Sequence, residues 1–441
     1  MTMPVAPNVV DLAIHARYIA PVEPAGVLEH HAVVVDAGRI VDLCPSKEVA
    51  ASYAPRKSVD LPTHVVIPGL VNAHAHSAMA LFRGVADDVA LARWLHEHIW
   101  PREGRHVSPE FVRDGTLLAC AEMLAGGITC CNDMYFYPEA SAQVFEEVGM
   151  RAMIGLPVLD FPTAYAADAD GYLRAGMAAR DQFRHARRLA FSLAPHAPYT
   201  VGDASFEKIV TLARQLDLPI QTHLQESRAE RDDALAAHGE TPLARLDRLG
   251  VTGPGFVAIH AVHPGTGDVE RLARQGCHVV HCPASNMKLA SGAAPVARYL
   301  AAGVNVALGT DGAASNNRLD LFAEMRLASL LAKVVSGDAA LLPASDILRM
   351  ATLGGARALG LEARIGSLVP GKAADLVAVD FASIALAPCY DPVSHLVHAA
   401  GREHVTDVWI DGERVVERRA LAGLEPAAIA ARAALWRDRI A

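Results

Sequence analysis

A series of short apolar runs, separated by helix-like segments, constrains the fold of this chain more than any other feature. Eight runs lie at residues 65–76, 127–136, 151–160, 189–199, 218–227, 255–263, 278–286 and 305–312. Near-continuous apolar runs are typical of parallel strands that are buried on both faces, and amphipathic stretches such as 108–127 and 203–217 separate them here. Eight such strand and helix units within about 250 residues predict a (β/α)8 TIM barrel of the α/β class.

Nearly every run ends in polar side chains. They are His74 and His76, Asp133, Asp160, His196, His223 with Glu226, His260 with His263, His281 with Asn286, and Asp311. In TIM barrels the active site lies at the carboxyl ends of the strands. The pattern therefore places these side chains on the functional face of the barrel, whereas chance would have scattered them along the strands.

The two ends of the chain have a different pattern. Residues 8–60 and 374–418 alternate as β-strands do, and each segment contains a hairpin signal, at 36–39 and at 411–412. Each end is too short to form a stable domain by itself. We predict one small β-sandwich built from both chain ends, with the domains 1–64 (first part of the sandwich), 65–370 (the metal-dependent barrel) and 371–441 (second part of the sandwich and a C-terminal helix).

Composition excludes several classes of protein. The chain has 441 residues, a net charge of −9 and no cluster of Lys and Arg, so we expect no nucleic-acid partner and no membrane surface. We find no signal peptide and no apolar stretch of about 18 residues that could span a bilayer. The seven cysteines are odd in number and include no Cys-x-x-Cys pair, which argues against a disulfide framework. We expect a cytoplasmic protein.

Three histidines and one aspartate at the strand ends suggest a metal site. His74 and His76 are two residues apart on a strand, so both imidazoles point to the same face, and His223 supplies a third nitrogen. Asp311, which lies between two glycines, supplies a carboxylate. This donor set suits one divalent ion, with Zn²⁺ as the first choice, and such an ion lowers the pKa of a bound water to about 7. Glu226 lies just beyond His223, where it could reach both that water and a substrate.

Five segments resemble a known family. They are PGLVNAHAHSAMALFRGVADD (68–88), SLAPHAPYTV (192–201), THLQES (222–227), HCPASNMKLASG (281–292) and LGTDGAASNN (308–317). Together they resemble the amidohydrolase superfamily, and within it the 5-methylthioadenosine/S-adenosylhomocysteine deaminases, which are relatives of the triazine hydrolases. The resemblance covers nearly the whole chain, including 366–380 and 408–412 in the end domain.

The resemblance implies catalytic roles for the same residues. The metal ligands of the family match His74, His76, His223 and Asp311. Glu226 matches the glutamate that moves protons between the metal-bound water and the ring nitrogen, and that also binds the substrate. His260 matches the histidine that stabilises the attacking hydroxide and the tetrahedral adduct, and Asp311 also helps to hold the water. The fourth strand ends without the lysine of the two-metal members, so a single metal is expected.

The resemblance also implies substrate contacts. Glu103 matches a glutamate that holds the ribose hydroxyls, and His196 matches a substrate-binding histidine. From spacing alone, Glu103 would be read as a solvated residue at a helix end. Members that favour S-adenosylhomocysteine use arginines for its carboxylate, and the segment after the third strand offers only Arg174. We therefore expect 5-methylthioadenosine and adenosine to be better substrates than S-adenosylhomocysteine.

The implied reaction is hydrolytic deamination of adenosine-type nucleosides by a metal-bound hydroxide, giving the inosine analogue and ammonia. Alternatives on the same scaffold are guanine, 8-oxoguanine or cytosine deamination, or triazine hydrolysis, and an alternative of another class is a non-catalytic barrel subunit. Glu103 discriminates among them, because a free base has no ribose for it to hold. The expected partner is a small-molecule nucleoside, and relatives often form homo-oligomers. The roles of His263, His281 and Asp133 stay open.

Overall fold

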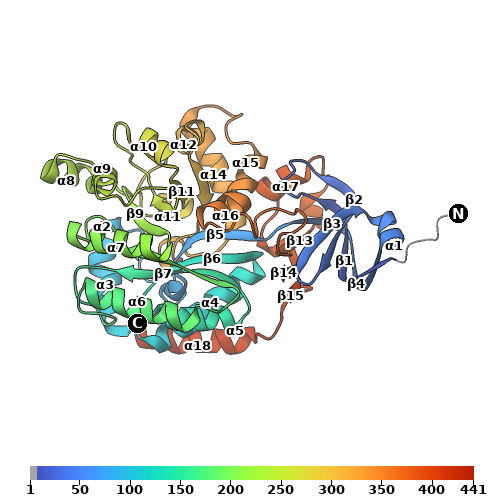
Figure 1. Ribbon diagram of the computed structural model, residues 1–441, viewed down its shortest axis with the longest axis horizontal. Coiled ribbons are helices and arrows are strands. Elements are labelled where there is room, and N and C mark those ends of the chain that lie inside the picture. Colours follow the sequence, from blue (N-terminus) through green and yellow to red (C-terminus); the bar gives the residue numbers. More distant parts are fainter. Residues whose placement is uncertain (1–6) are drawn as a thin grey trace.

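The computed structural model describes residues 7–441, and within this range the strands form two sheets of eight (Figure 1). One sheet contains only parallel neighbours, in chain order: β5 (Leu70–Ala75), β6 (Ile128–Met134), β7 (Arg151–Val158), β8 (Leu189–Pro195), β9 (Ile220–Leu224), β10 (Phe256–His260), β11 (His278–His281) and β12 (Asn305–Leu308). Each predicted apolar run contains one of these strands. The predicted barrel is confirmed.

The first and last strands of this sheet meet through polar contacts just beyond β12. The backbone N–H of Asp311 donates to the carbonyl of His74 at 3.0 Å. The side chain of Asn72 accepts from the N–H of Thr310 at 2.9 Å and donates to its hydroxyl at 2.7 Å. These bonds hold the ends of β5 and β12 together, and with them the side chains of His74 and Asp311.

Helices surround the barrel sheet (Figure 1). The predicted helices at 108–127 and 203–217 appear as α4 and α7, and α4 begins where the Ser108 hydroxyl accepts from the N–H of Phe111 and Pro109 takes the first helical position. The helices between β5 and the end of the barrel are α2 (Leu91–Arg93), α3 (Trp100–His106), α4 (Pro109–Ala125), α5 (Pro138–Glu147), α6 (Ala169–Phe183), α7 (Asp203–Leu216), α8 (Arg228–His238), α9 (Pro242–Arg248), α10 (Asp268–Gln275), α11 (Pro283–Lys288), α12 (Val296–Ala301), α13 (Ala313–Asn316), α14 (Leu321–Ser336), α15 (Ala344–Arg349) and α16 (Gly355–Ala358).

The second sheet, here called the terminal sheet, joins both chain ends as predicted. Its strands lie edge to edge in the order β16 (Ala420–Leu421), β15 (Glu413–Glu417), β14 (Val405–Ile410), β13 (Leu376–Asp380), β4 (Tyr53–Pro68), β1 (Asn8–Ile19), β2 (Leu28–Asp36) and β3 (Arg39–Pro45). Both hairpin signals form two-residue turns: φ is positive at Ala37 and Gly38, and at Asp411 and Gly412, as a type I′ turn requires. Short helices α1 (Val49–Ser52) and α17 (Pro392–His398) complete this part.

The run at 65–76, which was predicted as one strand, is divided between the two sheets. Its first residues belong to β4, which pairs with β1 and β13 as far as Pro68, and the barrel strand starts only at Leu70. Gly69 lies between them, and a Cβ at this position would be 2.0 Å from the hydroxyl oxygen of Thr129. The change of sheet therefore falls at Gly69, four residues after the expected domain start, because only a glycine can pass this close to β6.

The predicted C-terminal helix is α18 (Pro426–Ile440), and it packs on α4 of the barrel. Buried Trp436 donates its indole N–H to the carboxylate of Asp114 at 3.0 Å, and Arg432 donates to the same carboxylate at 2.8 Å. The chain thus returns from the terminal sheet to the barrel. Among residues 7–441, no helix is both long and apolar enough to cross a membrane.

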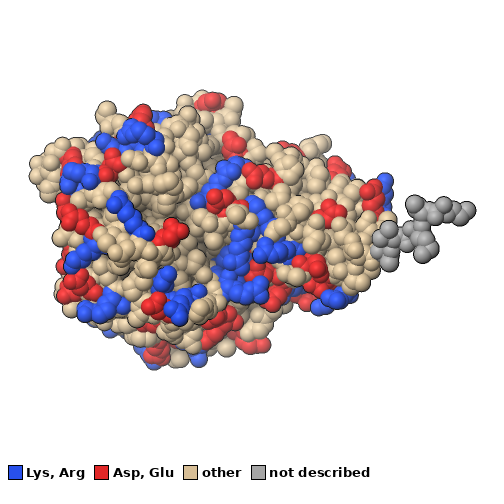
Figure 2. Space-filling model, viewed as in Figure 1, with Lys and Arg blue, Asp and Glu red and all other residues tan. Residues whose placement is uncertain are grey.

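Ion pairs cross the boundary between the barrel and the terminal sheet. Arg151, at the start of β7, pairs with Asp375 and Asp411, and Arg188 pairs with Asp411 and Glu413. On the face drawn in Figure 2, basic and acidic residues are interspersed, with a larger group of basic residues where the two parts meet. We name Arg151, Arg188, Asp375 and Asp411 the junction cluster.

Candidate active site

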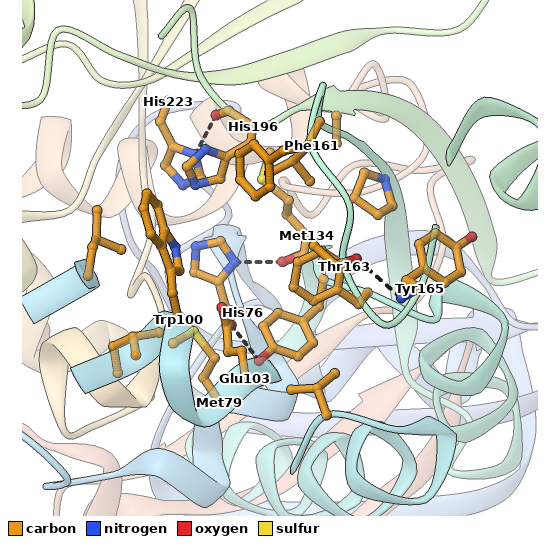
Figure 3. A pocket seen from close by; sticks show the side chains of 18 of the residues that line it. His76, Met79, Trp100, Glu103, Met134, Phe161, Thr163, Tyr165, His196 and His223 are labelled. Atoms are coloured by element: carbon orange, nitrogen blue, oxygen red, sulfur yellow. Dashed lines mark hydrogen bonds between the residues drawn. The ribbon is translucent and has the colours of Figure 1, made fainter. Parts of the chain in front are cut away.

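A cavity of about 270 Å³ opens at the carboxyl ends of the barrel strands (Figure 3). Its walls are mostly apolar and aromatic, with Trp100 and Phe161 among them. Of the residues predicted to act in the site, seven line this cavity: His76, Glu103, His196, His223, Glu226, His260 and Asp311. The eighth, His74, is fully buried beside them. The structure thus brings all the predicted site residues together.

The four predicted metal ligands lie within reach of one another. The Nε2 atoms of His74 and His76 are 3.4 and 3.3 Å from Oδ1 of Asp311. The ring centres of His74 and His223 are 5.0 Å apart. Potential ligand atoms lie within 4.8 Å of one another in two groups, His74 with His76 and Asp311, and His74 with His223 and His260. His260, which the sequence suggested only as a catalytic residue, therefore borders the same cluster.

Backbone carbonyls orient two of these imidazoles. Nδ1 of His76 donates to the carbonyl of Met134 at 2.5 Å, and Nδ1 of His223 donates to the carbonyl of His196 at 2.7 Å. Because a carbonyl oxygen only accepts, Nδ1 carries a proton, so in the neutral ring the lone pair lies on Nε2, the atom that can bind a metal. Neither ring nitrogen of His74 has a hydrogen-bond partner among the described residues. Burying such a group unpaired is costly, so this donor set fits a bound cation.

The pKa shifts in the cluster depend on burial and on how close each imidazole lies to Asp311. Burial lowers the pKa of His74 to about 4 and that of His223 well below its usual value, which keeps both imidazoles neutral, the form that binds metals. Burial would also lower the pKa of His76, but the Asp311 carboxylate more than offsets this and raises it to about 9. Burial opposes the ionised form of Asp311, yet His74 and His76 hold its pKa well below the usual range. Positive charge is therefore favoured beside Asp311.

The carboxylate of Asp311 is fixed by its surroundings. Its backbone has a φ of +60°, a conformation that non-glycine residues adopt rarely. Oδ2 accepts from the hydroxyls of Ser285 and Ser315 at 2.6 and 2.9 Å, and Oδ1 accepts from the N–H of Gly312 at 2.7 Å. These bonds hold the carboxylate in one orientation, with Oδ1 toward His74 and His76.

Glu226 and His260 face each other across the site. Oε2 of Glu226 is 3.8 Å from Nε2 of His260, which in turn is 3.9 Å from Oδ2 of Asp311. Oε1 of Glu226 accepts from the hydroxyl of Ser291 at 3.2 Å, and Nδ1 of His260 lies 2.9 Å from Oδ1 of Asn286. Burial raises the pKa of Glu226. A buried carboxyl group with a raised pKa beside a histidine is suited to accepting and returning a proton.

Glu103 reaches the cavity from α3, outside the metal cluster (Figure 3). Its Oε1 accepts from the hydroxyl of Tyr135 at 2.7 Å, and burial raises its pKa. His196 follows β8, and its Nδ1 lies 3.1 Å from the hydroxyl of Thr200. Burial, with His76 and His74 nearby, lowers the pKa of His196 to about 4, so this side chain is neutral at physiological pH.

The residues whose roles were left open lie outside the cavity. Nε2 of His263 donates to the carbonyl of Ser291 at 2.6 Å, and Asp133 accepts from the N–H of Ser77 at 2.7 Å. His281 is buried beneath the site. Arg174 is exposed on α6 and also lies outside the cavity lining.

Several supporting residues were not predicted from the sequence: Tyr135, Ser285, Ser291 and Glu230. Glu230 accepts from the backbone N–H groups of Gln225 and Glu226 at 2.9 and 3.0 Å, and its own N–H donates to Ser227 at 3.1 Å. The spacing of Ser227 and Glu230 is that of a capping box, a local signal that could have identified Glu230.

This chain is similar to known proteins over nearly its whole length. A 5-methylthioadenosine/S-adenosylhomocysteine deaminase of Saccharophagus degradans is 44% identical over 431 residues, which are 98% of this chain and 97% of the relative. The crystal structure of an adenosine deaminase from Xanthomonas campestris with bound zinc is 48% identical, has a TM-score of 0.97, and the match covers 98% of this chain and 99% of that one. Atrazine chlorohydrolase from Arthrobacter aurescens TC1 with zinc shares the fold, with a TM-score of 0.90 at 23% identity over 96% of this chain and 99% of that one.

The model of the amidohydrolase family matches residues 65–415, which include the whole barrel and most of the returning strands. This match confirms the resemblance that the motifs suggested. The strand ends that hold the histidines and Asp311 all lie within it. The chain belongs to the amidohydrolase family.

Proposed function

We propose that this protein hydrolytically deaminates adenosine-type nucleosides, with 5-methylthioadenosine and adenosine preferred over S-adenosylhomocysteine. One observation carries the proposal. A single cavity presents Glu103, a carboxylate outside the metal cluster, together with the cluster itself and Glu226. A volume of about 270 Å³ suits a small molecule. The names of the relatives, which include an adenosine deaminase with bound zinc, support the same reaction.

In this proposal His74, His76, His223 and Asp311 hold one divalent metal ion, with zinc as the expected ion. The ion supplies Lewis acidity, which makes a water molecule acidic enough to attack at neutral pH. Two observations support this assignment. Neither ring nitrogen of His74 has a hydrogen-bond partner among the described residues, and backbone carbonyls accept from the Nδ1 atoms of His76 and His223.

The chain's own residues then handle the protons. Glu226 takes a proton from the attacking water and delivers it to N1 of the purine, so that C6 becomes tetrahedral as the new C–O bond forms. His260 and Asp311, whose side chains lie 3.9 Å apart, hold the attacking oxygen. A second proton passes through Glu226 to the exocyclic amine, the C6–N bond breaks, and ammonia leaves the inosine analogue. His196 lines the cavity beside the cluster and contacts the base.

Glu103 separates this reaction from its alternatives. A carboxylate that accepts hydrogen bonds from the ribose hydroxyls has no role in the deamination of guanine, 8-oxoguanine or cytosine, or in triazine hydrolysis. A non-catalytic barrel would have no need of a buried imidazole without hydrogen-bond partners, such as His74. Among the described residues, no Lys or Arg lines the cavity, which supports the lower rank of S-adenosylhomocysteine with its charged amino-acid tail.

A spectroscopic screen tests the proposal. The wild type and the Glu103→Ala variant are compared on adenosine, 5-methylthioadenosine, S-adenosylhomocysteine, adenine, guanine and cytosine. Wild type should prefer the nucleosides, and Glu103→Ala should lose about tenfold to a few hundredfold in kcat/KM on nucleosides, as expected when a charged hydrogen bond is lost, with little change on any base. A wild-type preference for adenine or guanine over the nucleosides would contradict the nucleoside assignment.

A further inference from the structure

The end of β6 contacts two parts of the site through adjacent residues, Met134 and Tyr135. The carbonyl of Met134 accepts from Nδ1 of His76 at 2.5 Å, and the hydroxyl of Tyr135 donates to Oε1 of Glu103 at 2.7 Å. Figure 3 shows the bond between His76 and Met134, with Glu103 close by. The end of one rigid barrel strand therefore orients a predicted metal ligand and the predicted ribose-binding carboxylate.

Tyr135 is well placed to control Glu103. Its side chain is buried, with 6% of the residue exposed, and its ring centre lies 6.4 Å from that of His76. A tyrosine hydroxyl has one proton to donate, and here that proton is directed at Oε1 of Glu103. The second oxygen, Oε2, accepts no hydrogen bond from any residue between 7 and 441, while the Glu103 side chain lines the cavity. Oε2 is thus left available to a ligand.

Among the described residues, the hydrogen bond from Tyr135 is the one that holds the Glu103 carboxylate. The metal ligands lie on or next to barrel strands, whereas Glu103 lies on α3, a seven-residue helix that follows the π-helical stretch Trp94–Ile99. A glutamate side chain has three rotatable bonds, and fixing it only when the substrate binds would reduce affinity. A hydrogen bond from the barrel fixes it beforehand.

We propose that Tyr135 is a positioning residue that holds Glu103 in the orientation that receives the ribose hydroxyls and thereby sets the selectivity for ribonucleosides. This inference rests on the proposed function of the site. It assigns to Tyr135 an effect that depends on two other groups: the carboxylate of Glu103 and the hydroxyls of the sugar.

The test removes the tyrosine hydroxyl and the sugar hydroxyls separately. Wild type and Tyr135→Phe are compared on adenosine and 2′,3′-dideoxyadenosine. Tyr135→Phe should lose about tenfold in kcat/KM on adenosine, mainly through a higher KM, because a hydrogen bond to a charged group is lost. On the dideoxynucleoside, which cannot use Glu103, the loss should stay below about twofold. Metal content and thermal midpoint should remain those of wild type.

Two further comparisons make the test specific. In a Glu103→Ala background, Tyr135→Phe should have almost no further effect, because the residue through which it acts is gone. Tyr53→Phe removes a similar bond, from a tyrosine hydroxyl to the carboxylate of Asp42 at 3.0 Å in the terminal sheet, and should change neither substrate.

Equal losses on the two substrates, or losses from Tyr135→Phe and Glu103→Ala that multiply in the double variant, would overturn the inference alone. If Tyr135→Phe proves unstable, Glu103→Gln in the wild-type background replaces it, since a glutamine can still accept from Tyr135 but is no longer a carboxylate. Selectivity for adenosine that survived in Glu103→Gln and in Glu103→Ala alike would also overturn the inference. A wild type inactive on every nucleoside would overturn the proposed function and the inference together.

Discussion

Two buried groups of ionisable side chains lie at opposite ends of the barrel strands, and they differ in how the protein satisfies them. In the junction cluster, Nε and Nη2 of Arg151 donate to the two carboxylate oxygens of Asp375 at 2.9 and 3.0 Å, and Nη2 also reaches Asp411 at 2.8 Å. At the carboxyl ends of the strands, His74 lies among imidazoles and a carboxylate, and neither of its nitrogens has a hydrogen-bond partner among residues 7–441.

The difference separates a structural group from a functional one. In the junction cluster the charges are paired and the ion pairs hold two segments together, although Nη1 of Arg151 also lacks a hydrogen-bond partner among residues 7–441. Buried neutral imidazoles that face one another, as those of His74 and His223 do, are costly to the fold, and a cation that accepts their lone pairs offsets that cost. Substitutions in the junction cluster should therefore change stability, and substitutions at the strand ends should change metal binding and turnover.

The largest effect is expected from removing a metal ligand. His74→Ala should lose the bound metal and reduce turnover below detection, and a chelator should do the same to the wild type. Elemental analysis and a deamination assay measure the two losses, with zinc expected in the wild type. The control is His278→Gln at the first residue of β11, the end of the strand away from the site. This variant should keep both the bound metal and the turnover of wild type. Full turnover in protein shown to be free of metal would contradict the metal assignment.

Glu226→Gln should keep the metal and the fold while kcat falls by about 10²–10⁴-fold, the contribution typical of a general acid–base group. The amide retains the size of the side chain but cannot carry the proton between water and N1. Single-turnover kinetics with metal-loaded protein measure the loss, and Glu270→Gln, an exposed glutamate on α10, serves as the control. Near-normal turnover of Glu226→Gln would mean that another group moves the proton.

At the junction cluster the expected change is in stability alone. Arg151→Met leaves the Asp375 carboxylate buried without its cation, which should lower the free energy of unfolding by about 3–5 kcal/mol. Denaturant unfolding measures this change, and kcat/KM should stay within about twofold of wild type. The exposed pair between Lys208 and Asp170 is the matched control, because Lys208→Met should cost less than about 1 kcal/mol. A large fall in kcat/KM for Arg151→Met would contradict the claim that the junction cluster affects stability and not catalysis.

The smallest effect is expected at Arg174. This residue is exposed on α6 and lies outside the lining of the cavity, so Arg174→Ala should leave kcat/KM on S-adenosylhomocysteine and on adenosine unchanged within about twofold. A selective loss on S-adenosylhomocysteine would show that its amino-acid carboxylate reaches α6. The measurement is a comparison of the two substrates with the same preparation of each variant.

Local sequence patterns were sufficient for the framework of this protein. The eight apolar runs became eight parallel strands, and the two-residue hairpins formed at 37–38 and 411–412. Such features depend on residues close together in the chain, where apolar periodicity and turn preferences act directly. The gathering of the histidines and Asp311 also followed from the sequence, because the carboxyl ends of parallel strands in a barrel must lie on one face.

The supports around the site could not be predicted in the same way. Tyr135 meets Glu103 across 32 residues, and Ser291 meets Glu226 across 65. Neither partner carries a local mark of the contact, since a tyrosine after a strand and a serine in a loop are common. Glu230 is the exception, because its bonds reach back only four or five residues along the chain.

The sequence by itself therefore determined the strands, their order and the residue types at their ends. The tertiary structure alone decided where one sheet ends and the next begins, since the apolar run at 65–76 changes sheets at Gly69, where the chain passes against Thr129. It also decided that α18 covers α4 and that Tyr135 supports Glu103. Periodicity reports how one segment is buried, whereas contacts between distant segments depend on the packing of the whole chain, and that packing is not encoded in any one segment.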